Sequence, residues 1–328
     1  MPRLSRRYLF TASLSLVPAG AAAQPAFFPS RPIRILVGFA PGGGNDVVAR
    51  IVAQKLSEGS LGQILVDNRT GASGLIAADM LAKSPADGTT LMVAAQTTYA
   101  VAPLLYKSVA FDGPRDVAGV ALLGTSPLVL VTNPSFAARS VRELIEMAKA
   151  RPGTINFGSG GVGTTPHMAA ERFLFNTGIR MTHVPYRGEA PAIADVLAGQ
   201  LPLLFSNISV VTAQVKAGAL RALAVTSPKR APGLSDVPTL SEAGVTGSDV
   251  ETWFGLAAPA ATPREILQRL NAEVRKALAA ADLQQRFAEL SLSVTPSSPE
   301  ELDALIKSDA VRWGDVIRRA GIRAPELN

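Results

Sequence analysis

Two glycine-rich segments have the residue types and spacing to bind an anion. The first reads PGGGND at residues 41–46, and the second reads GSGGVG at 158–163. Each segment follows an apolar run and precedes a stretch with helical periodicity. Glycine lets a ligand approach the backbone closely, and the free N–H groups at the start of a helix attract negative charge. We therefore expect these segments to hold a small anion through backbone donors.

A nucleotide is the first alternative for these segments. Residues 41–46 lack the Lys-Ser/Thr ending of a Walker loop, so they do not indicate a nucleoside triphosphate. Residues 158–163 match the G-x-G-x-x-G pattern of dinucleotide folds, in which the next strand ends in an acidic residue that binds the ribose. Here that strand ends near Arg187, and Glu189 comes only beyond the turn. An exported, cofactor-binding oxidoreductase remains the alternative function.

Other catalytic centres find no support in the sequence. The chain has no cysteine, which excludes disulfides, thiolate metal sites and thiol nucleophiles. His167 and His183 lie on different segments without metal-ligand spacing. We expect a structural role for His183, whereas a ligand contact and a structural role both remain open for His167. FGSGG is out of register for the nucleophile elbow of a serine hydrolase, so we expect no catalytic residue, no metal and no cofactor.

The charge distribution argues against nucleic acid as a partner. The formal net charge is +6, and residues 1–23 contribute three arginines and no acidic residue, so the remaining chain carries +3. Its basic residues are scattered and have no interleaved aromatic side chains, whereas a nucleic-acid interface needs a basic patch. A mildly positive chain suits a small anionic ligand.

The N-terminus is organised as a secretory signal. Arg3, Arg6 and Arg7 precede an apolar stretch at 8–17, and a run of alanines at 21–23 forms a cleavage site. The apolar stretch is too short and too interrupted for a membrane span. The segment SRRYLF also fits the twin-arginine export signal, so two export routes remain open. We expect residues 1–23 to be a signal peptide.

Strand-like and helix-like segments alternate along the mature chain. Apolar runs at 33–39, 63–68 and 89–95 are separated by stretches with helical periodicity, which indicates a βαβαβ unit with a parallel sheet. A second unit with this alternation follows at 140–207. We therefore predict an α/β fold of two lobes, each a mainly parallel sheet flanked by helices. The rest of the chain predicts a strand at 250–260 and helices at 263–280, 282–289 and 299–320.

A series of long, ordered motifs covers nearly all of the mature chain. They are PSRPIRILVGFAPGGGNDVVARIVAQKL, SPADGTTLMVAA, SVRELIEMAKARPGTINFGSGGVGTTPHMAAERF, HVPYRGEAPAIADVLAGQ, GALRALAVTSPKRAPGLSDVPTLSEAG and WFGLAAPAATPREILQRLNAEV. Together they resemble the Bug (TctC-like) family, the periplasmic substrate-binding proteins of tripartite tricarboxylate transporters.

The resemblance implies a two-lobed periplasmic binding protein fold of type II-like architecture, with the ligand in a cleft between the lobes. Lobe 1 is expected to comprise residues 31–125 and 253–328, and lobe 2 residues 126–252. The implied function is that of a monomeric extracytoplasmic receptor, without enzymatic activity, for a small carboxylate or related compound. The receptor would deliver this ligand to membrane transporter subunits, and a ligand sensor for a signalling system is the alternative.

The resemblance also places ligand contacts on the loops at the strand ends of both lobes. In lobe 1 the expected contacts are Phe39, Ala40, Gly43, Gly44, Asn45, Asp46, Gln96, Thr97 and Thr98. In lobe 2 they are Ser159, Gly160, Gly163, Thr164, Thr165, His167, Arg187, Ser206 and Asn207.

Three positions depart from the family pattern. Many members have an Asp-Asn pair where this chain has Ser206 and Asn207, and the missing carboxylate argues against an amino-acid ligand. Arg187 replaces the commoner lysine and offers a planar fork suited to a carboxylate. Pro166 stands where serine is usual, and it removes a donor from the first turn of the following helix.

Overall fold

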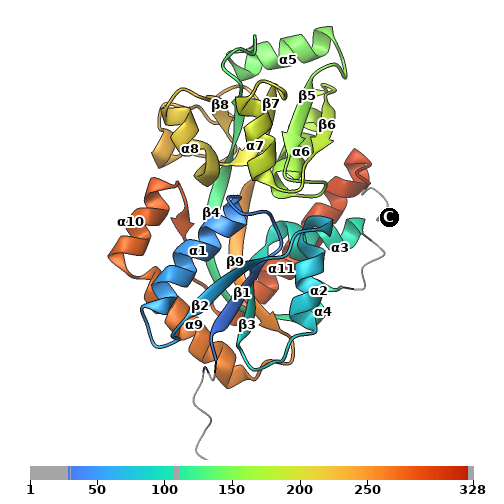
Figure 1. The fold of residues 1–328 in the computed structure, drawn as a ribbon. Helices are drawn as coiled ribbons and strands as arrows, with labels where there is room; N and C mark the ends of the chain where they lie inside the picture. The colour runs from blue at the N-terminus through green and yellow to red at the C-terminus, as the bar shows by residue number, and fades with distance from the viewer. Residues whose placement is uncertain (1–28, 30, 107–110, 324–328) are drawn as a thin grey trace, which may run out of the picture.

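The computed structural model describes residue 29 and residues 31–106 and 111–323. The chain forms two lobes joined by long strands (Figure 1). One lobe contains α1 (Gly44–Ser57) and β1 (Ile33–Val37), and the other contains α5 (Val141–Ala150), α6 (Thr165–Thr177) and α7 (Glu189–Leu197). The predicted signal peptide at 1–23 lies outside the described residues. Within the described part, no helix is long and apolar enough to cross a membrane.

Lobe 1 is built on strands β1 (Ile33–Val37), β2 (Ile64–Asn68), β3 (Thr90–Ala95) and β9 (Glu251–Pro259). β1 pairs in parallel with β2 and β3, whereas β9 is antiparallel to β3, so the sheet is mixed. Side chains alternate between the two faces of a strand. Ile33 and Ile35 accordingly pack with α1 (Gly44–Ser57) and α9 (Arg264–Leu278), whereas Leu36 packs with α2 (Leu75–Ala82) on the opposite face.

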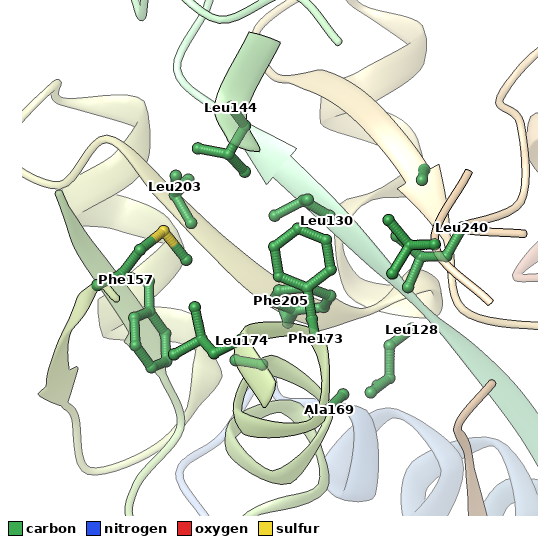
Figure 2. Close-up of a cluster of buried hydrophobic side chains, with 14 of the residues drawn as sticks. Leu128, Leu130, Leu144, Phe157, Ala169, Phe173, Leu174, Leu203, Phe205 and Leu240 are labelled. Atoms are coloured by element: carbon green, nitrogen blue, oxygen red, sulfur yellow. The ribbon is translucent and has the colours of Figure 1, made fainter. Parts of the chain in front are cut away.

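Lobe 2 contains alternating strands and helices, as the sequence predicts for residues 140–207. They are α5 (Val141–Ala150), β5 (Asn156–Ser159), α6 (Thr165–Thr177), β6 (Thr182–Pro185), α7 (Glu189–Leu197), β7 (Leu203–Asn207), α8 (Ile208–Lys216) and β8 (Arg221–Val225). β5 pairs in parallel with β6 and β7. Phe157 of β5, Phe173 of α6 and Phe205 of β7 lie in one buried cluster (Figure 2). This packing fixes α6 against the strands and so positions the GSGGVG loop between β5 and α6.

Strand β4 (Val117–Thr132) belongs to both lobes. Residues 117–127 pair antiparallel with β9, and residues 128–132 pair antiparallel with β7 and β8. The change of partner falls between Pro127, which faces Glu251, and Leu128, which faces Asn207. Both lobes therefore carry antiparallel pairs beside their parallel ones.

Helix α11 (Pro299–Ala320) also contacts both lobes. Leu302 and Ile306 belong to the core cluster of lobe 1, whereas Trp313 and Ile317 belong to the core cluster of lobe 2. Between these two groups, the buried carboxylate of Asp309 accepts hydrogen bonds from Gln96 Nε2 at 2.8 Å and from Trp253 Nε1 at 2.7 Å, and it pairs with Arg312 at 2.9 Å.

The remaining elements are short. They are η1 (Ala72–Gly74), η2 (Thr97–Val101), α3 (Ala102–Leu105), α4 (Gly113–Asp116), η3 (Pro232–Leu234), α10 (Ala281–Glu289) and β10 (Ser293–Val294). The predicted helices at 282–289 and 299–320 correspond to α10 and α11, while η2 forms one π-helical turn directly after β3.

Candidate functional site

The loops at the carboxyl ends of the strands in both lobes meet at a small cavity, here called the inner cavity. It has a volume of about 20 Å³, which is room for one water-sized group. Lobe 1 contributes the PGGGND loop and the end of β3, and lobe 2 contributes the starts of α6, α7 and α8. The lining residues are Phe39, Gly43, Gly44, Asn45, Ala95, Thr97, Gly160, Thr164, Thr165, Pro166, Glu189, Asn207 and Thr252.

Asp46 shapes the PGGGND loop from the first turn of α1. Its carboxylate accepts hydrogen bonds from the N–H of Gly42, Nε of Arg50 and Nδ2 of Asn68, each at 2.9 Å. Burial alone would raise the pKa of Asp46, but these hydrogen bonds and the charge of Arg50 outweigh it and lower that pKa. Asp46 is therefore a structural anion that holds the loop in place beside the inner cavity.

The N-terminus of α1 binds a carboxylate of the protein itself, that of Glu189. Glu189, the first residue of α7, accepts a hydrogen bond from the N–H of Gly44 at 3.2 Å across the interface between the lobes. It also accepts hydrogen bonds from the backbone N–H of Asn207 at 2.9 Å and from its Nδ2 at 3.0 Å. A side chain at Gly44 would lie 2.9 Å from Asn207 Nδ2, so glycine permits this close approach.

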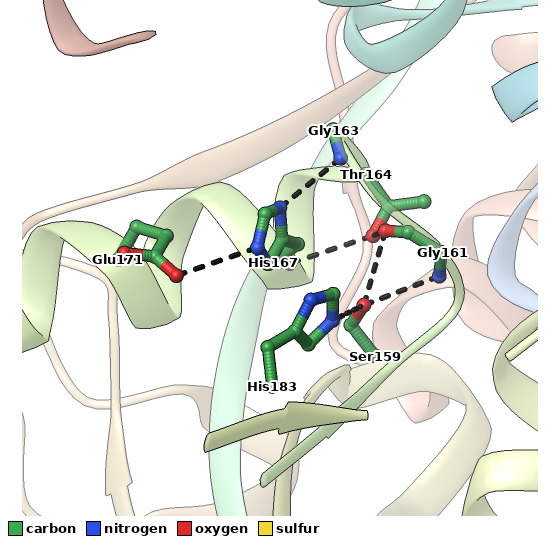
Figure 3. Close-up of polar contacts among 7 residues, drawn as sticks. All are labelled: Ser159, Gly161, Gly163, Thr164, His167, Glu171 and His183. Atoms are coloured by element: carbon green, nitrogen blue, oxygen red, sulfur yellow. Dashed lines mark hydrogen bonds and ion pairs between the residues drawn. The ribbon is translucent and has the colours of Figure 1, made fainter. Parts of the chain in front are cut away.

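The GSGGVG loop is held from the lobe 2 side by a polar cluster (Figure 3). Ser159 Oγ lies 2.7 Å from His183 Nε2 and accepts the N–H of Gly161 at 3.1 Å. His167 Nδ1 accepts the N–H of Gly163 at 3.1 Å, and its Nε2 lies 3.4 Å from Glu171 Oε1. These groups fix the loop, and neither histidine lines the inner cavity.

The two histidines form a stack with Phe157. The ring centroids of His167 and His183 are 3.9 Å apart, and those of His183 and Phe157 are 5.0 Å apart. Burial, and then repulsion from His167, lowers the pKa of His183 to about 3. Although Ser159 and His183 are close enough to act as a nucleophile and base, Ser159 is fully buried. Its hydroxyl accepts a hydrogen bond from the N–H of Gly161 and lies against His183, so in this structure the cluster supports the loop.

The backbone N–H groups at the start of α6 already donate hydrogen bonds to groups of the protein. The N–H of Thr165 donates to Thr97 Oγ1 at 3.0 Å, and the N–H of His167 donates to Thr164 Oγ1 at 3.4 Å. Pro166 between them has no N–H. A dinucleotide fold needs free N–H groups at this position for the pyrophosphate, so the arrangement removes the main support for an oxidoreductase that uses GSGGVG.

A second and larger space, here called the outer cavity, adjoins the inner one. Phe39 and Gly160 line both cavities, and the outer cavity has a volume of about 530 Å³. Arg187 also lines it, and this side chain forms no ion pair with any other residue that the structure describes. Ser73 Oγ donates to the carbonyl of Val162 at 2.5 Å, which joins the two lobes at this cavity.

Half of the expected contact residues line the inner cavity, and Arg187 lines the outer one. Those on the inner cavity are Phe39, Gly43, Gly44, Asn45, Thr97, Gly160, Thr164, Thr165 and Asn207. The others line neither cavity: they are Ala40, Asp46, Gln96, Thr98, Ser159, Gly163, His167 and Ser206. Gln96, for example, donates to Asp309, and Thr98 donates to the carbonyl of Ser73.

The sequence analysis missed Glu189 as a site residue. Its one signal in the sequence is an acidic residue in the first turn of a helix, which normally complements the dipole of that helix in solvent. In the structure Glu189 is 7% exposed, and its Oε1 lies 3.5 Å from Ser206 Oγ. The serine at 206 therefore does not leave the pocket without a carboxylate, and the argument against an amino-acid ligand loses its basis.

Comparisons with known proteins agree with this architecture. The family model for the tripartite tricarboxylate transporter family receptor, TctC, matches residues 48–322. BugT of Bordetella pertussis is 35% identical over 321 residues, which are 97% of this chain and 98% of that protein. The structure of R. palustris Rpa4515 with adipate is 35% identical, with a TM-score of 0.88 over 91% of this chain and 100% of that chain.

A third relative has a different ligand. MatC (Rpa3494) from Rhodopseudomonas palustris with bound malate is 30% identical, with a TM-score of 0.84 over 88% of this chain and 100% of that chain. The family match, the curated relative and the solved structures each cover most of this chain. The chain belongs to the TctC family of receptors of tripartite tricarboxylate transporters, which includes the Bug proteins.

Proposed function

We propose that the mature protein is a monomeric periplasmic receptor that binds a small carboxylate and delivers it to the membrane subunits of a tripartite tricarboxylate-type transporter. It acts without catalysis and without a cofactor. Residues 1–23 direct export and are then removed. Membership of the TctC family supports the receptor role, and the adipate and malate in related structures support the class of ligand.

The observation that carries the carboxylate assignment is Arg187 in the outer cavity. Arg187 is exposed, lines a space of about 530 Å³ between the lobes and has no acidic partner among the described residues. Small-molecule sites commonly have volumes of about 300–1,000 Å³. A guanidinium binds a carboxylate through two parallel N–H donors, so Arg187 suits one end of a small organic acid.

Ligand binding is accompanied by movement of the lobes as two bodies. The proposed division assigns residues 31–125 and 253–328 to lobe 1 and residues 126–252 to lobe 2. The change of strand partners after Pro127 supports a hinge at this position. Thr252 of β9 lies beside it, because Ser126 faces Thr252 in the β4–β9 ladder. In hinge motions, a few residues between the two rigid bodies commonly absorb the change in backbone angles.

The test is a thermal-shift screen of the purified mature protein against small mono- and dicarboxylates. A ligand present at 100 times its dissociation constant stabilises the folded protein by about 2.7 kcal/mol. Arg187→Ala should then raise the Kd of the best ligand by about tenfold to a hundredfold, because a hydrogen bond to a charged group contributes about 1.5–3 kcal/mol. Arg139→Ala, which removes another exposed arginine of lobe 2, is the control.

Two results would contradict this proposal. If no carboxylate raises the melting temperature of the wild-type protein, the ligand class is wrong. If Arg187→Ala and Arg139→Ala bind the best carboxylate equally well, Arg187 is not the group that receives it.

A further inference from the structure

Glu189 occupies the anion position that the first glycine loop provides. Its Oε2 accepts the N–H of Gly44 and Nδ2 of Asn207, at 3.2 and 3.0 Å. Its Oε1 accepts the backbone N–H and Nδ2 of Asn207, at 2.9 and 3.0 Å. Ser206 Oγ lies 3.5 Å from Oε1 as well. A carboxylate has about four acceptor positions, so these contacts leave Glu189 fully paired.

This arrangement places a negative charge on the inner cavity. The residues that line this cavity, all within the described part of the chain, include no lysine, arginine or histidine. A second carboxylate in the inner cavity would therefore meet a like charge in a buried space, where screening by water is weak. Arg187, which has no ion-pair partner among the described residues, lines the outer cavity instead.

Among the described residues, the buried side-chain atoms that line the inner cavity without a hydrogen-bond partner are acceptors. Asn207 is 5% exposed, and both Glu189 oxygens accept from its Nδ2. Since a carboxylate cannot donate, this pairing fixes the orientation of the amide, and Asn207 Oδ1 is left buried without a hydrogen bond. Asn45 Oδ1 is likewise buried without a partner among the described residues, and both side chains line the inner cavity. Buried acceptors of this kind call for a donor.

Size points to the same kind of group. The inner cavity, at about 20 Å³, admits one water-sized group, such as a hydroxyl or an ammonium, and is too small for the three heavy atoms of a carboxylate. The adjoining outer cavity, at about 530 Å³, has room for the rest of a small organic acid.

We propose that Glu189 determines specificity: the ligand places a hydrogen-bond donor, a hydroxyl or an ammonium, in the inner cavity and its carboxylate at Arg187. The receptor thereby selects hydroxy or amino monocarboxylates over dicarboxylates. This inference rests on the proposed function, since it names the class of carboxylate that the same site takes.

The experiment compares acids of equal length that differ only at the far end. Adipate, 6-aminohexanoate, 6-hydroxyhexanoate and hexanoate form one series, and succinate, 4-aminobutanoate, 4-hydroxybutanoate and butanoate form the other. Calorimetry measures the Kd of each with the wild-type protein. We expect the amino or hydroxy acid of at least one series to bind at least tenfold more tightly than the dicarboxylate and the unsubstituted acid of that series.

Two variants of Glu189 then test its role. Glu189→Ala frees the donors on Gly44 and Asn207, so the dicarboxylate should gain at least tenfold in affinity and the amino or hydroxy acid should lose its advantage. Glu189→Gln keeps the shape and removes the charge: an ammonium ligand should weaken at least tenfold, whereas a hydroxyl ligand should change less than threefold. Glu146→Ala and Glu146→Gln, at an exposed position of α5, are the matched controls and should leave every Kd unchanged.

The outcomes separate the two proposals. If the wild-type protein binds none of the eight acids, both the carboxylate function and the inference fail. If it binds carboxylates but prefers a dicarboxylate, or if neither Glu189 variant changes the order of preference, the inference fails and the proposed function stands. Circular dichroism of each variant shows whether it is folded. If Glu189→Ala does not fold, the binding data for Glu189→Gln alone test the inference.

Discussion

Lowering the pH from 7 to 4.5 should destabilise this protein, and His183 should account for a large part of the loss. The His183 ring lies between the rings of His167 and Phe157, with Nε2 2.7 Å from Ser159 Oγ. Burial and the neighbouring His167 lower the pKa of His183 from 6.5 to about 3. The folded protein therefore binds a proton at this ring only under strongly acidic conditions.

The sign and size follow from the difference between the folded and unfolded states. The unfolded chain takes up a proton at His183 below pH 6.5, whereas the folded chain does so only near pH 3. The contribution of this ring is therefore fully present above pH 6.5 and is lost as the pH falls toward 3. One pH unit corresponds to about 1.4 kcal/mol, so at pH 4.5 the free energy of unfolding should be lower by about 2–3 kcal/mol.

Urea denaturation followed by circular dichroism at pH 7, 5.5 and 4.5 measures this loss. The comparison variant is His183→Phe, which keeps an aromatic ring in the stack and removes the titrating group. Carboxylates such as Glu251 and Asp303, whose pKa values are raised by partial desolvation, contribute to the pH dependence of both proteins and cancel in the difference. If wild type and His183→Phe lose the same free energy between pH 7 and 4.5, the neutral buried His183 is not the cause.

Three further expectations concern packing between the lobes. Asp309→Asn should lower the free energy of unfolding by about 2–3 kcal/mol in urea denaturation, because it removes a charged acceptor, while the exposed Asp315→Asn on the same helix should cost under about 0.5 kcal/mol. Gly163→Ala should lower the melting temperature more than Gly178→Ala: both glycines have positive φ, but only at Gly163 would a Cβ meet a side chain of lobe 1, Leu105, at 2.6 Å. Solution scattering should show a smaller radius of gyration with a saturating ligand than without one, and an unchanged value would argue against closure about the β4 crossing.

The order of elements could be predicted from the sequence because it depends on local patterns. Alternating apolar runs and helical stretches gave the βαβ units, and the predicted strand at 63–68 and helix at 299–320 agree closely with β2 and α11. Strand β4 was harder to predict as a single strand. Pro127 interrupts the apolar pattern, although the strand continues through this residue into the other lobe. Pairing partners that lie far apart in the sequence leave no local signal.

The site could be predicted as a pair of loops but not as a set of contacts. Gly44, Thr97 and Asn207 line the inner cavity as expected, since their motifs fall at the ends of strands. Glu189 could not be identified, because its role depends on a hydrogen bond to Gly44, 145 residues away in the sequence. Ser159 was expected to touch the ligand but holds the loop from behind, since an inward and an outward hydroxyl look the same in a glycine-rich motif.

Helix α11 has a consequence for how quickly the receptor can exchange its ligand. Leu302 and Ile306 are part of one core, whereas Trp313 and Ile317 are buried in the other, so the lobes cannot separate widely while both ends of the helix stay packed. Opening must either bend α11 near Asp309 or release its last turns from α6. By the second route, release of the ligand and fraying of the C-terminal helix are one coupled event, and amide hydrogen exchange in those last turns would report the opening rate of the cleft.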